Sequence, residues 1–265
     1  MKIAIIGAGN MGGALARGLA KGSRIATSDV YVSNPSTAKL EALKAEFSEI
    51  NTSSDNCAVV READIIILAV KPWKVEEVLT QIKPHIDYSR QAVASLVGGL
   101  GIAQLSQWLD KGNGVLPATY IIMPNTAIAT MSSMTFICSA RSTAERDNSL
   151  LEIFNELGQA MLIEESAMPA ATSLASCGIA YALRYIRAAM EGGVELGIRA
   201  DDAKHIVMQT LRGAVDLLAT NDTHPEAEID RVTTPGGLTI KGLNAMEAAG
   251  FTYSVIEGLR ASTKR

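Results

Sequence analysis

The chain has 265 residues, of which 48% are hydrophobic and 20% are charged, and its formal net charge is −4. This length suits one or two domains with a sizeable core, and this composition excludes an intrinsically disordered chain. The sequence contains no block of like charges, so we expect no nucleic-acid partner. Its first residues run directly into an apolar segment, so we also expect no signal peptide.

The cysteines and histidines are few and scattered. Cys57, Cys138 and Cys177 form no C-x-x-C pair, which predicts free thiols in a cytoplasmic protein. The three histidines lack the spacing of metal ligands, so we expect no metal site.

One uncharged segment is long enough to be considered as a membrane span. Residues Ser166–Leu183 carry no charge, but they are rich in alanine and serine and include Pro169 and Gly178. True spans are more strongly apolar. We therefore expect no membrane insertion, and we interpret this segment as a helix buried in protein at a subunit interface.

The N-terminal segment combines three elements in the order of a dinucleotide-binding unit. Lys2–Ile6 is predicted to be a buried strand, Gly7–Gly12 follows as G-x-G-x-x-G, and Gly13–Lys21 is predicted to be a helix. The start of such a helix offers free N–H groups and a positive dipole end to phosphates. The alternative is a glycine-rich loop that only turns the chain.

Each glycine of the motif has a physical role in the first interpretation. Gly7 permits the tight turn, Gly9 lets a pyrophosphate approach the backbone, and Gly12 lets the helix pack closely on the strand. The predicted cofactor-binding residues of this loop are Gly7, Gly9, Asn10, Met11 and Gly12.

The tip of the second predicted strand, Val30–Val32, bears on the choice of cofactor. An acid at this tip holds the ribose 2′-hydroxyl in NAD-specific folds. Asp29 lies before the strand, whereas Ser33 and Asn34 at its tip are neutral donors. This pattern favours NADP(H), and both tip residues are predicted to contact the cofactor. The alternative is an ordinary turn that accepts NAD(H) equally well.

Two helices are predicted after this tip. Ser36 or Thr37 can cap the helix Lys39–Phe47, whose N-terminus could help to hold a 2′-phosphate. A second helix is expected over Ser53–Ala63, which Ser53 or Ser54 could cap.

The next predicted strand, Asp64–Val70, is apolar and ends in Lys71-Pro72. Ligands of parallel sheets bind beyond the carboxyl ends of the strands, so Ala69, Val70, Lys71 and Pro72 are predicted to face the cofactor. Lys71 could contact a phosphate or ribose, or it could simply be solvated.

The rest of the first half keeps alternating between strands and helices, as a parallel, doubly wound sheet requires. The predicted strands are Ala92–Val97, Tyr120–Met123, Ser133–Ser139 and Ala160–Ile163, and the predicted helices are Lys74–Ile82, Ala103–Leu109 and Ala144–Leu157. The predicted fold class is α/β: a Rossmann-type parallel sheet in residues 1–163, followed by an all-α dimerisation domain in residues 164–265.

The second half shows only helical patterns. We predict one long, alanine-rich helical stretch over Glu165–Leu196, an amphipathic helix over Asp201–Thr220, a short helix over Glu226–Arg231, and two helices after Pro235. So few helices cannot easily enclose a core of their own. Their apolar faces need partners, which predicts a homodimer or a larger ring of dimers.

A second chemical motif occupies Val232–Thr239, with the sequence Val-Thr-Thr-Pro-Gly-Gly-Leu-Thr. Two glycines that follow Pro235 and open a helix at about Thr239 form a backbone nest, in which successive N–H groups suit a carboxylate. The alternative is a glycine turn with threonine caps.

Taken together, these motifs resemble those of the pyrroline-5-carboxylate reductases, and the resemblance extends over nearly the whole chain. The family's Gly-x-Gly-Asn-Met-Gly corresponds to Gly7–Gly12, and its Ala-Val-Lys-Pro corresponds to Ala69–Pro72. Its Met-Pro-Asn-Thr corresponds to Met123–Thr126, and its Val-Thr-x-Pro-Gly-Gly-x-Thr corresponds to Val232–Thr239.

The resemblance implies that NADPH, or sometimes NADH, delivers hydride to the imine of 1-pyrroline-5-carboxylate to give L-proline. It implies that the backbone at Gly236, Gly237 and Leu238 holds the substrate carboxylate. Thr239 would bond to the ring nitrogen and is the predicted catalytic residue, and Thr234 would line the pocket. Such a site needs few acids and bases, because a protonated imine is already an electrophile.

The resemblance also places Val232 at the substrate and Asn56 and Asn125 at the cofactor, with Asn56 on the adenine-side ribose. Three departures from the family pattern occur. Ile121 replaces an arginine, Ala127 replaces a proline, and Gly-Ser-Gly-Pro-Ala is changed to Ser-Cys-Gly-Ile-Ala at residues 176–180.

Two other functional classes compete with the reductase. Related hydroxyacid or F420-linked dehydrogenases are one class, but the hydroxyacid enzymes usually carry a catalytic lysine on the long helix, and Glu165–Leu196 contains no lysine. A non-catalytic, cofactor-binding paralogue is the other class. The intact Thr239 and nest argue against it.

Overall fold

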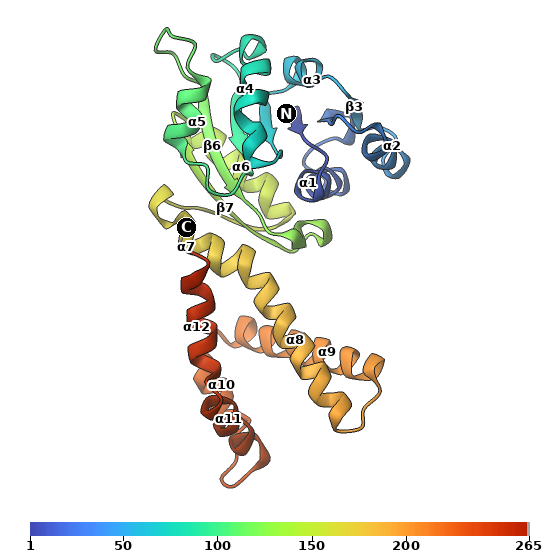
Figure 1. Ribbon diagram of the computed structural model, residues 1–265, viewed down its shortest axis with the longest axis vertical. Coiled ribbons are helices and arrows are strands. Elements are labelled where there is room, and N and C mark those ends of the chain that lie inside the picture. The colour runs from blue at the N-terminus through green and yellow to red at the C-terminus, as the bar shows by residue number, and fades with distance from the viewer. Residues whose placement is uncertain (264–265) are drawn as a thin grey trace. The chain divides into compact units, whose positions relative to one another are not determined.

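The computed structural model describes residues 1–263; residues 264–265, at the end of the predicted second domain, lie outside the described range. The chain divides into two compact units, Met1–Ser176 and a second unit that begins at Cys177. The first unit contains the sheet and its covering helices, and the second contains helices only (Figure 1).

Within residues 1–263 the strands form one eight-stranded sheet in the order β3-β2-β1-β4-β5-β6-β7-β8. The strands are β1 (Ile3–Ile6), β2 (Val30–Ser33), β3 (Asn51–Ser53), β4 (Ile65–Leu68), β5 (Ala92–Ser95), β6 (Ala118–Met123), β7 (Ser133–Ala140) and β8 (Gly158–Leu162). The order of the first six is that of dinucleotide-binding sheets, in which the strand order reverses between β1 and β4. The predicted Rossmann-type sheet is confirmed.

The sheet departs from the sequence prediction at β7. This strand pairs antiparallel with β6, whereas all the other neighbouring strands pair in parallel. The connection between β6 and β7 contains only the short 3₁₀ turn η4 (Thr126–Thr130), and a parallel crossover needs a longer connection. The chain therefore turns back instead of crossing over.

A second departure concerns the predicted helix Ser53–Ala63. Its first residue belongs to β3, which pairs with β2, and the helix α3 (Asn56–Glu62) begins later. Asp55 is its N-cap and accepts a hydrogen bond from the Cys57 amide at 2.8 Å, so the predicted serine cap is wrong. The polar strand β3 has no apolar pattern by which the sequence could reveal it.

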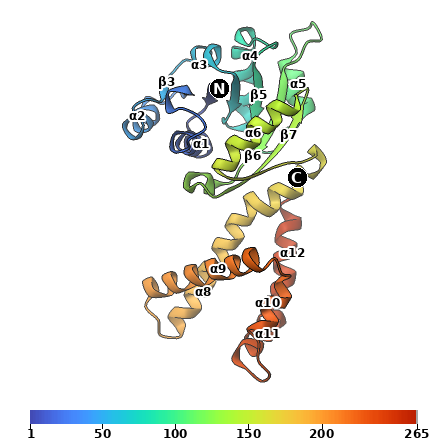
Figure 2. The same cartoon turned by 180° about the vertical axis from the view of Figure 1, so that it is seen from behind.

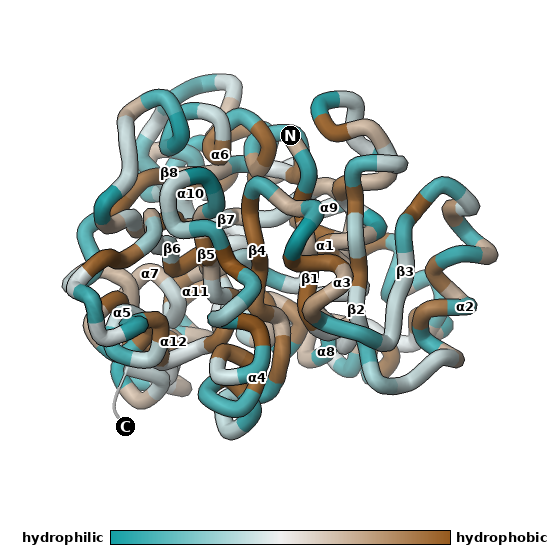
Figure 3. The backbone as a smooth tube through the Cα atoms, turned by 90° about the horizontal axis from the view of Figure 1, so that it is seen from above, coloured by the Kyte–Doolittle hydropathy of each residue, from teal (hydrophilic) through white to brown (hydrophobic). Residues whose placement is uncertain are grey.

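Helices cover both faces of the sheet (Figures 1 and 2). One buried cluster joins the sheet to α1 (Asn10–Lys21), α2 (Thr37–Glu46) and α6 (Ala144–Glu156). A cluster on the opposite face joins it to α3, α4 (Val75–Ile82), α5 (Ile102–Leu109) and α7 (Met168–Thr172). The central strands β1 and β4 are buried throughout and coloured as hydrophobic in Figure 3. This burial on both faces is what parallel sheets require.

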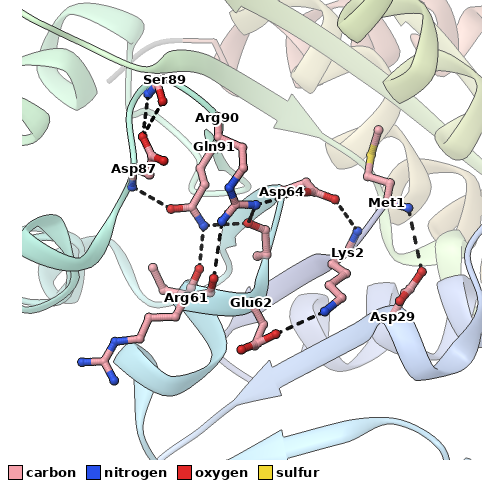
Figure 4. Close-up of polar contacts among 12 residues, drawn as sticks. Met1, Lys2, Asp29, Arg61, Glu62, Asp64, Asp87, Ser89, Arg90 and Gln91 are labelled. Carbon is pink, nitrogen blue, oxygen red and sulfur yellow. Dashed lines mark hydrogen bonds and ion pairs between the residues drawn. The ribbon is translucent and has the colours of Figure 1, made fainter.

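Polar contacts tie the amino ends of the strands together, at the edge opposite the glycine-rich turn Gly7–Gly12 (Figure 4). The Lys2 amide donates to the Asp64 carboxylate at 2.8 Å, and Arg90 donates to the same carboxylate at 2.9 Å. The buried Gln91 donates to the carbonyls of Val60 and Ala63, at 2.7 and 2.6 Å. These bonds fix the end of α3 against the starts of β4 and β5.

The predicted helical stretch Glu165–Leu196 is helical from Glu165 to Glu195, but its hydrogen-bonding type changes along the chain. It begins with the 3₁₀ turn η5 (Glu165–Ala167) and α7, passes through a π-helical turn at Ser173–Cys177, and continues as α8 (Gly178–Glu195). No helix within residues 1–263 is long and apolar enough to span a membrane.

The second unit also contains α9 (Ala200–Asn221), α10 (Pro225–Arg231), α11 (Leu238–Ala248) and α12 (Phe251–Ala261). Tyr181 on α8 donates to the Gly258 carbonyl of α12 at 3.0 Å, and Tyr185 contacts Phe251 edge-on. Among the described residues from 177 onward, only Ala203 is buried in the single chain. The helical unit therefore lacks an apolar core of its own.

Candidate active site

A cavity of about 680 Å³ lies at the carboxyl ends of β1, β2 and β4. Nine predicted cofactor residues line it: Gly7, Gly9, Asn10, Met11, Asn34, Asn56, Ala69, Val70 and Lys71. Eight further residues line it that the sequence analysis did not assign to the cofactor: Ile6, Pro35, Lys39, Ser54, Lys74, Glu77, Val78 and Gln81. The remaining predicted cofactor residues, Gly12, Ser33, Pro72 and Asn125, are outside this lining.

The glycines of the loop have different surroundings. Gly7 has φ +107°, and a Cβ there would lie 2.7 Å from the Ala69 carbonyl oxygen. A Cβ on Gly12 would lie 1.9 Å from the Gly7 carbonyl oxygen, because α1 packs closely on this turn. A Cβ on Gly9 would meet nothing within 4 Å. Only Gly9 therefore leaves open space, next to the N-terminus of α1, where a phosphate can approach the amides.

A chain of side-chain hydrogen bonds forms one wall of the cavity. The buried Ser33 hydroxyl donates to Asn56 Oδ1 at 2.7 Å, and Asn56 Nδ2 donates to Gln81 Oε1 at 2.9 Å. Ser33 therefore lies behind the wall and orients Asn56, which lines the cavity.

The tip of β2 is held by Asn34. Its Oδ1 accepts from the Ala8 amide at 3.0 Å, and its Nδ2 donates to the Ser36 carbonyl at 3.2 Å. Ser36 is the N-cap of α2 but makes no side-chain capping bond, so the predicted serine or threonine cap does not form. The first amides of α2 thus remain open toward the tip.

Lysines make the cavity electropositive. Lys39, in the first turn of α2, and Lys71, after β4, make no ion pair within residues 1–263. Lys74 pairs with Glu77 at 2.8 Å, which offsets its charge. The two unpaired lysines and the helix starts favour an anionic ligand.

The carboxyl end of β6 carries Asn125, which is buried. Its Oδ1 accepts from the Ala127 amide at 3.0 Å, and its own amide donates to the Ser133 hydroxyl at 3.1 Å. Pro72 opens the exposed 3₁₀ turn η2 (Pro72–Lys74) after β4. Both residues lie at the carboxyl edge of the sheet that also carries the cavity.

The Cys57 thiol, beside the cavity residue Asn56, is not activated as a nucleophile. Burial raises the pKa of the Cys57 thiol, next to Asn56, and the Asp55 carboxylate raises it further. A neutral thiol is a poor nucleophile. Within residues 1–263, no group of three or more His, Cys, Asp or Glu side chains could hold a metal ion.

The second motif forms a tight turn in the helical unit. The Gly237 amide donates to the Thr234 carbonyl at 2.9 Å, with Pro235 and Gly236 between them and Gly236 at φ +70°. Proline followed by a residue with positive φ is the signature of a type II turn. A Cβ on Gly237 would lie 2.5 Å from the Thr234 hydroxyl oxygen, so both glycines are required by the turn.

This turn opens directly into α11. The first-turn amides of a helix, here including those of Leu238 and Thr239, have no intrahelical partner. Gly237 is the N-cap and has no side chain that could accept from them. Val232 and Leu238 are exposed by 60% and 87%, and Thr239 is exposed as well. The predicted substrate residues thus lie within or just before this helix start, whose free amides attract an anion.

Comparison with known proteins identifies the family. Pyrroline-5-carboxylate reductase 2 of Dictyostelium discoideum is 37% identical over 276 residues, which cover 99% of this chain and 91% of that protein. The chain belongs to the pyrroline-5-carboxylate reductase family. The resemblance drawn from the motifs is confirmed. Pyrroline-5-carboxylate reductase 1 of the same organism is 36% identical over 275 residues, covering 99% of this chain, and the chain spans about half (49%) of its length.

Domain profiles and a solved structure agree with this family. Residues 165–265 match the family described as pyrroline-5-carboxylate reductase dimerisation, and residues 2–97 match the NADP oxidoreductase, coenzyme F420-dependent family. The crystal structure of a Plasmodium falciparum pyrroline carboxylate reductase with NADP bound superposes with a TM-score of 0.89 at 30% identity. The alignment covers 99% of this chain and 95% of that one.

The sequence analysis did not assign Lys39 and Gln81 to the cavity, and only one of them could have been predicted to line it. Lys39 lies in the first turn of the helix after the β2 tip, and first-turn side chains lie near such a tip, so its position could have been inferred. Gln81 reaches Asn56 only because α4 packs beside α3. No local pattern indicates that contact.

Proposed function

We propose that this chain reduces 1-pyrroline-5-carboxylate to L-proline with a reduced nicotinamide dinucleotide, the last step of proline biosynthesis. The observation that carries the proposal is the type II turn Thr234–Gly237, which opens α11 with uncapped amides. A carboxylate next to an imine nitrogen matches a helix start followed at once by a hydroxyl, and the family membership supports the same substrate.

The cavity of the first unit fits a dinucleotide. Its space at Gly9 and the open start of α1 would hold the pyrophosphate, and Asn56 would bond to the adenine-side ribose. The reduced nicotinamide supplies hydride when bound. Gly7 shapes the turn, while Asn10 and Met11 begin α1 and line the cavity. The remaining predicted contacts, at Ala69 to Pro72 and Asn125, lie at the edge toward the nicotinamide half.

We propose NADP(H) as the preferred cofactor, with NAD(H) as a weaker one. Asn34 is a neutral residue at the tip of β2, so no carboxylate there would repel a 2′-phosphate. Lys39 projects from the first turn of α2 into the same cavity and would pair with that phosphate. Ser33 would act through Asn56, because its hydroxyl is already bonded to that side chain.

The substrate would bind at the helix start of the second unit. The backbone amides at Gly236, Gly237 and Leu238 would hold its carboxylate, while Thr234 and Val232 would line the pocket. Thr239 would hydrogen-bond the ring nitrogen. A threonine hydroxyl is a weak acid, so its role is to orient the nitrogen and not to protonate it. The protonated imine itself, or water, would supply the proton.

The helical unit would assemble with a second copy, as a dimer or a ring of dimers. Its described residues bury only Ala203 in the single chain, and an apolar groove of about 780 Å³ lies between α9 and α10. Exposed apolar faces of this extent favour burial against a partner. The match to a dimerisation family supports the same conclusion.

The two predicted domains have different proposed roles. We propose that residues 1–163 bind the dinucleotide and that residues 164–265 bind the substrate and the partner subunit. A cytoplasmic location rests on the cysteines alone, since Cys57, Cys138 and Cys177 are free thiols, as a reducing compartment favours.

The direct test is NADPH oxidation by purified protein, followed by absorbance, with 1-pyrroline-5-carboxylate as substrate and NADH in parallel. We expect fast, substrate-dependent oxidation, with a higher kcat/KM for NADPH than for NADH. If the protein binds NADPH but oxidises neither cofactor, it is a non-catalytic cofactor-binding paralogue or acts on another imine.

A further inference from the structure

The segment that leads from the sheet into α8 carries a contact to the carboxyl edge of the sheet. The Ser176 hydroxyl donates to the Pro124 carbonyl, just beyond β6, at 3.2 Å. Both residues belong to the first unit. Ser176 lies in the π-helical turn Ser173–Cys177, and such turns occur frequently at functional sites.

The segment before Ser176 is anchored firmly. The Glu165 carboxylate accepts from the Ile102 amide at 2.7 Å, at the start of α5, and a Cβ on Gly101 would lie 2.7 Å from the same carboxylate oxygen. Met168 is buried in the core cluster on that face of the sheet. The π-helical turn is therefore held against the sheet, and Ser176 can act as a fixed support.

The turn that Ser176 contacts is also held by hydrogen bonds of Asn125. The Asn125 amide donates to the Ser133 hydroxyl at 3.1 Å, and the Asn125 side chain accepts from the Ala127 amide at 3.0 Å. These contacts come from β7 and from the loop itself. Ser176 supplies the anchor on the side of α7 and thereby fixes the plane of the Pro124–Asn125 peptide.

The order of the sheet indicates which half of the cofactor faces this turn. A dinucleotide lies across the reversal between β1 and β4. The cavity reaches from β4 to the tip of β2 and the start of α2, which places the adenosine half on the β2 side. The nicotinamide half then lies on the side of β5 and β6, where Pro124 and Asn125 follow the end of β6.

We propose that Ser176 is a positioning residue for the nicotinamide half of the cofactor, acting through the Pro124 carbonyl. This inference rests on the proposed function. Without the Ser176 hydroxyl, the carbonyl of the Pro124–Asn125 peptide loses its anchor, and the nicotinamide loses a fixed wall. The adenosine half, held at β1, β2 and α2, keeps all of its contacts.

The test compares two ligands by isothermal titration calorimetry with the full chain. NADPH occupies both halves of the site, whereas adenosine 2′,5′-bisphosphate occupies only the adenosine half. For Ser176→Ala we expect NADPH to bind roughly threefold to tenfold more weakly, the range for one lost hydrogen bond, with unchanged binding of the bisphosphate. Ser176→Thr, which keeps the hydroxyl, should restore NADPH binding.

Ser149→Ala is the matched control, because it removes a serine hydroxyl that donates to the Glu145 carbonyl at 2.9 Å within α6. Both ligands should bind this variant as they bind the unmodified chain. Unchanged binding of both ligands to Ser176→Ala, or equal weakening of both, would overturn the positioning role. Failure of the unmodified chain to bind NADPH would instead overturn the proposed function, and this inference with it.

Discussion

A Cβ atom on Gly12 would lie only 1.9 Å from the Gly7 carbonyl oxygen. This contact sets how closely α1 packs on the turn after β1, and so where the start of the helix points. Gly9, between them, faces open space. One motif thus contains a glycine that the packing requires and a glycine that leaves open space beside the helix start.

The pair Gly12→Ala and Gly9→Ala separates these two roles. Gly12→Ala should destabilise the protein by about 1–3 kcal/mol, because the new methyl group forces the helix and the turn apart. Gly9→Ala should leave the melting temperature nearly unchanged but weaken NADPH binding, because its methyl group occupies the open space. Thermal unfolding and NADPH titration of both variants provide the test. Equal melting temperatures for the two variants would contradict the assignment.

Lys39→Ala should reduce the preference for NADPH. Removing one charged partner of the 2′-phosphate should lower kcat/KM for NADPH roughly tenfold and leave that for NADH nearly unchanged. Steady-state kinetics with both cofactors measures the ratio. Lys44→Ala, which removes the same charge from the last turn of α2, is the control. If both cofactors lose activity equally, Lys39 does not discriminate between them.

Thr239→Ala should lower kcat roughly tenfold to a hundredfold while NADPH binding stays intact, because the ring nitrogen loses its orienting bond. Thr239→Ser keeps the hydroxyl and should retain most of the activity. Kinetics with 1-pyrroline-5-carboxylate and a separate cofactor titration distinguish turnover from binding. Unchanged kcat in Thr239→Ala would exclude the proposed role.

Alkaline pH should destabilise the first unit through Tyr120. Burial raises the pKa of this phenol to about 12 from 10, so the folded state favours the neutral form. Its contribution to stability is fully present below pH 10 and is lost as the pH rises from 10 to 12. Relative to Tyr120→Phe, the free energy of unfolding should fall by roughly 1.4 kcal/mol between pH 9 and pH 11. Urea unfolding at both pH values measures this difference, and parallel pH profiles would contradict it.

A charge on the apolar face of α9 should prevent assembly. Val215 is 63% exposed in the single chain, so Val215→Lys should not disturb the fold of the chain but should oppose burial against a partner. Sedimentation velocity should show a smaller species than for the unmodified protein. Gln209→Lys adds the same charge at an exposed polar position of α9 and should leave assembly unchanged. A Val215→Lys variant of unchanged size would place the interface elsewhere.

The features that could be predicted from the sequence alone are local. The first strand and the helix after it follow from apolar runs in the sequence. The loop Gly7–Gly12 between them follows from backbone conformations that only glycine adopts easily. The turn Thr234–Gly237 follows from proline and glycine in the same way. Alternation of strands and helices up to residue 163, and helices alone afterwards, was sufficient to predict the fold class.

The features that depend on distant segments could not be predicted without the packed fold. The length of the connection before β7 reversed that strand, and the packing of α4 beside α3 brought Gln81 to Asn56. The burial of Ser33 behind that wall, and the contact of Ser176 with Pro124, likewise join residues far apart in the chain. Such contacts leave no periodic signal, because they depend on how whole elements pack and not on the residues next to them.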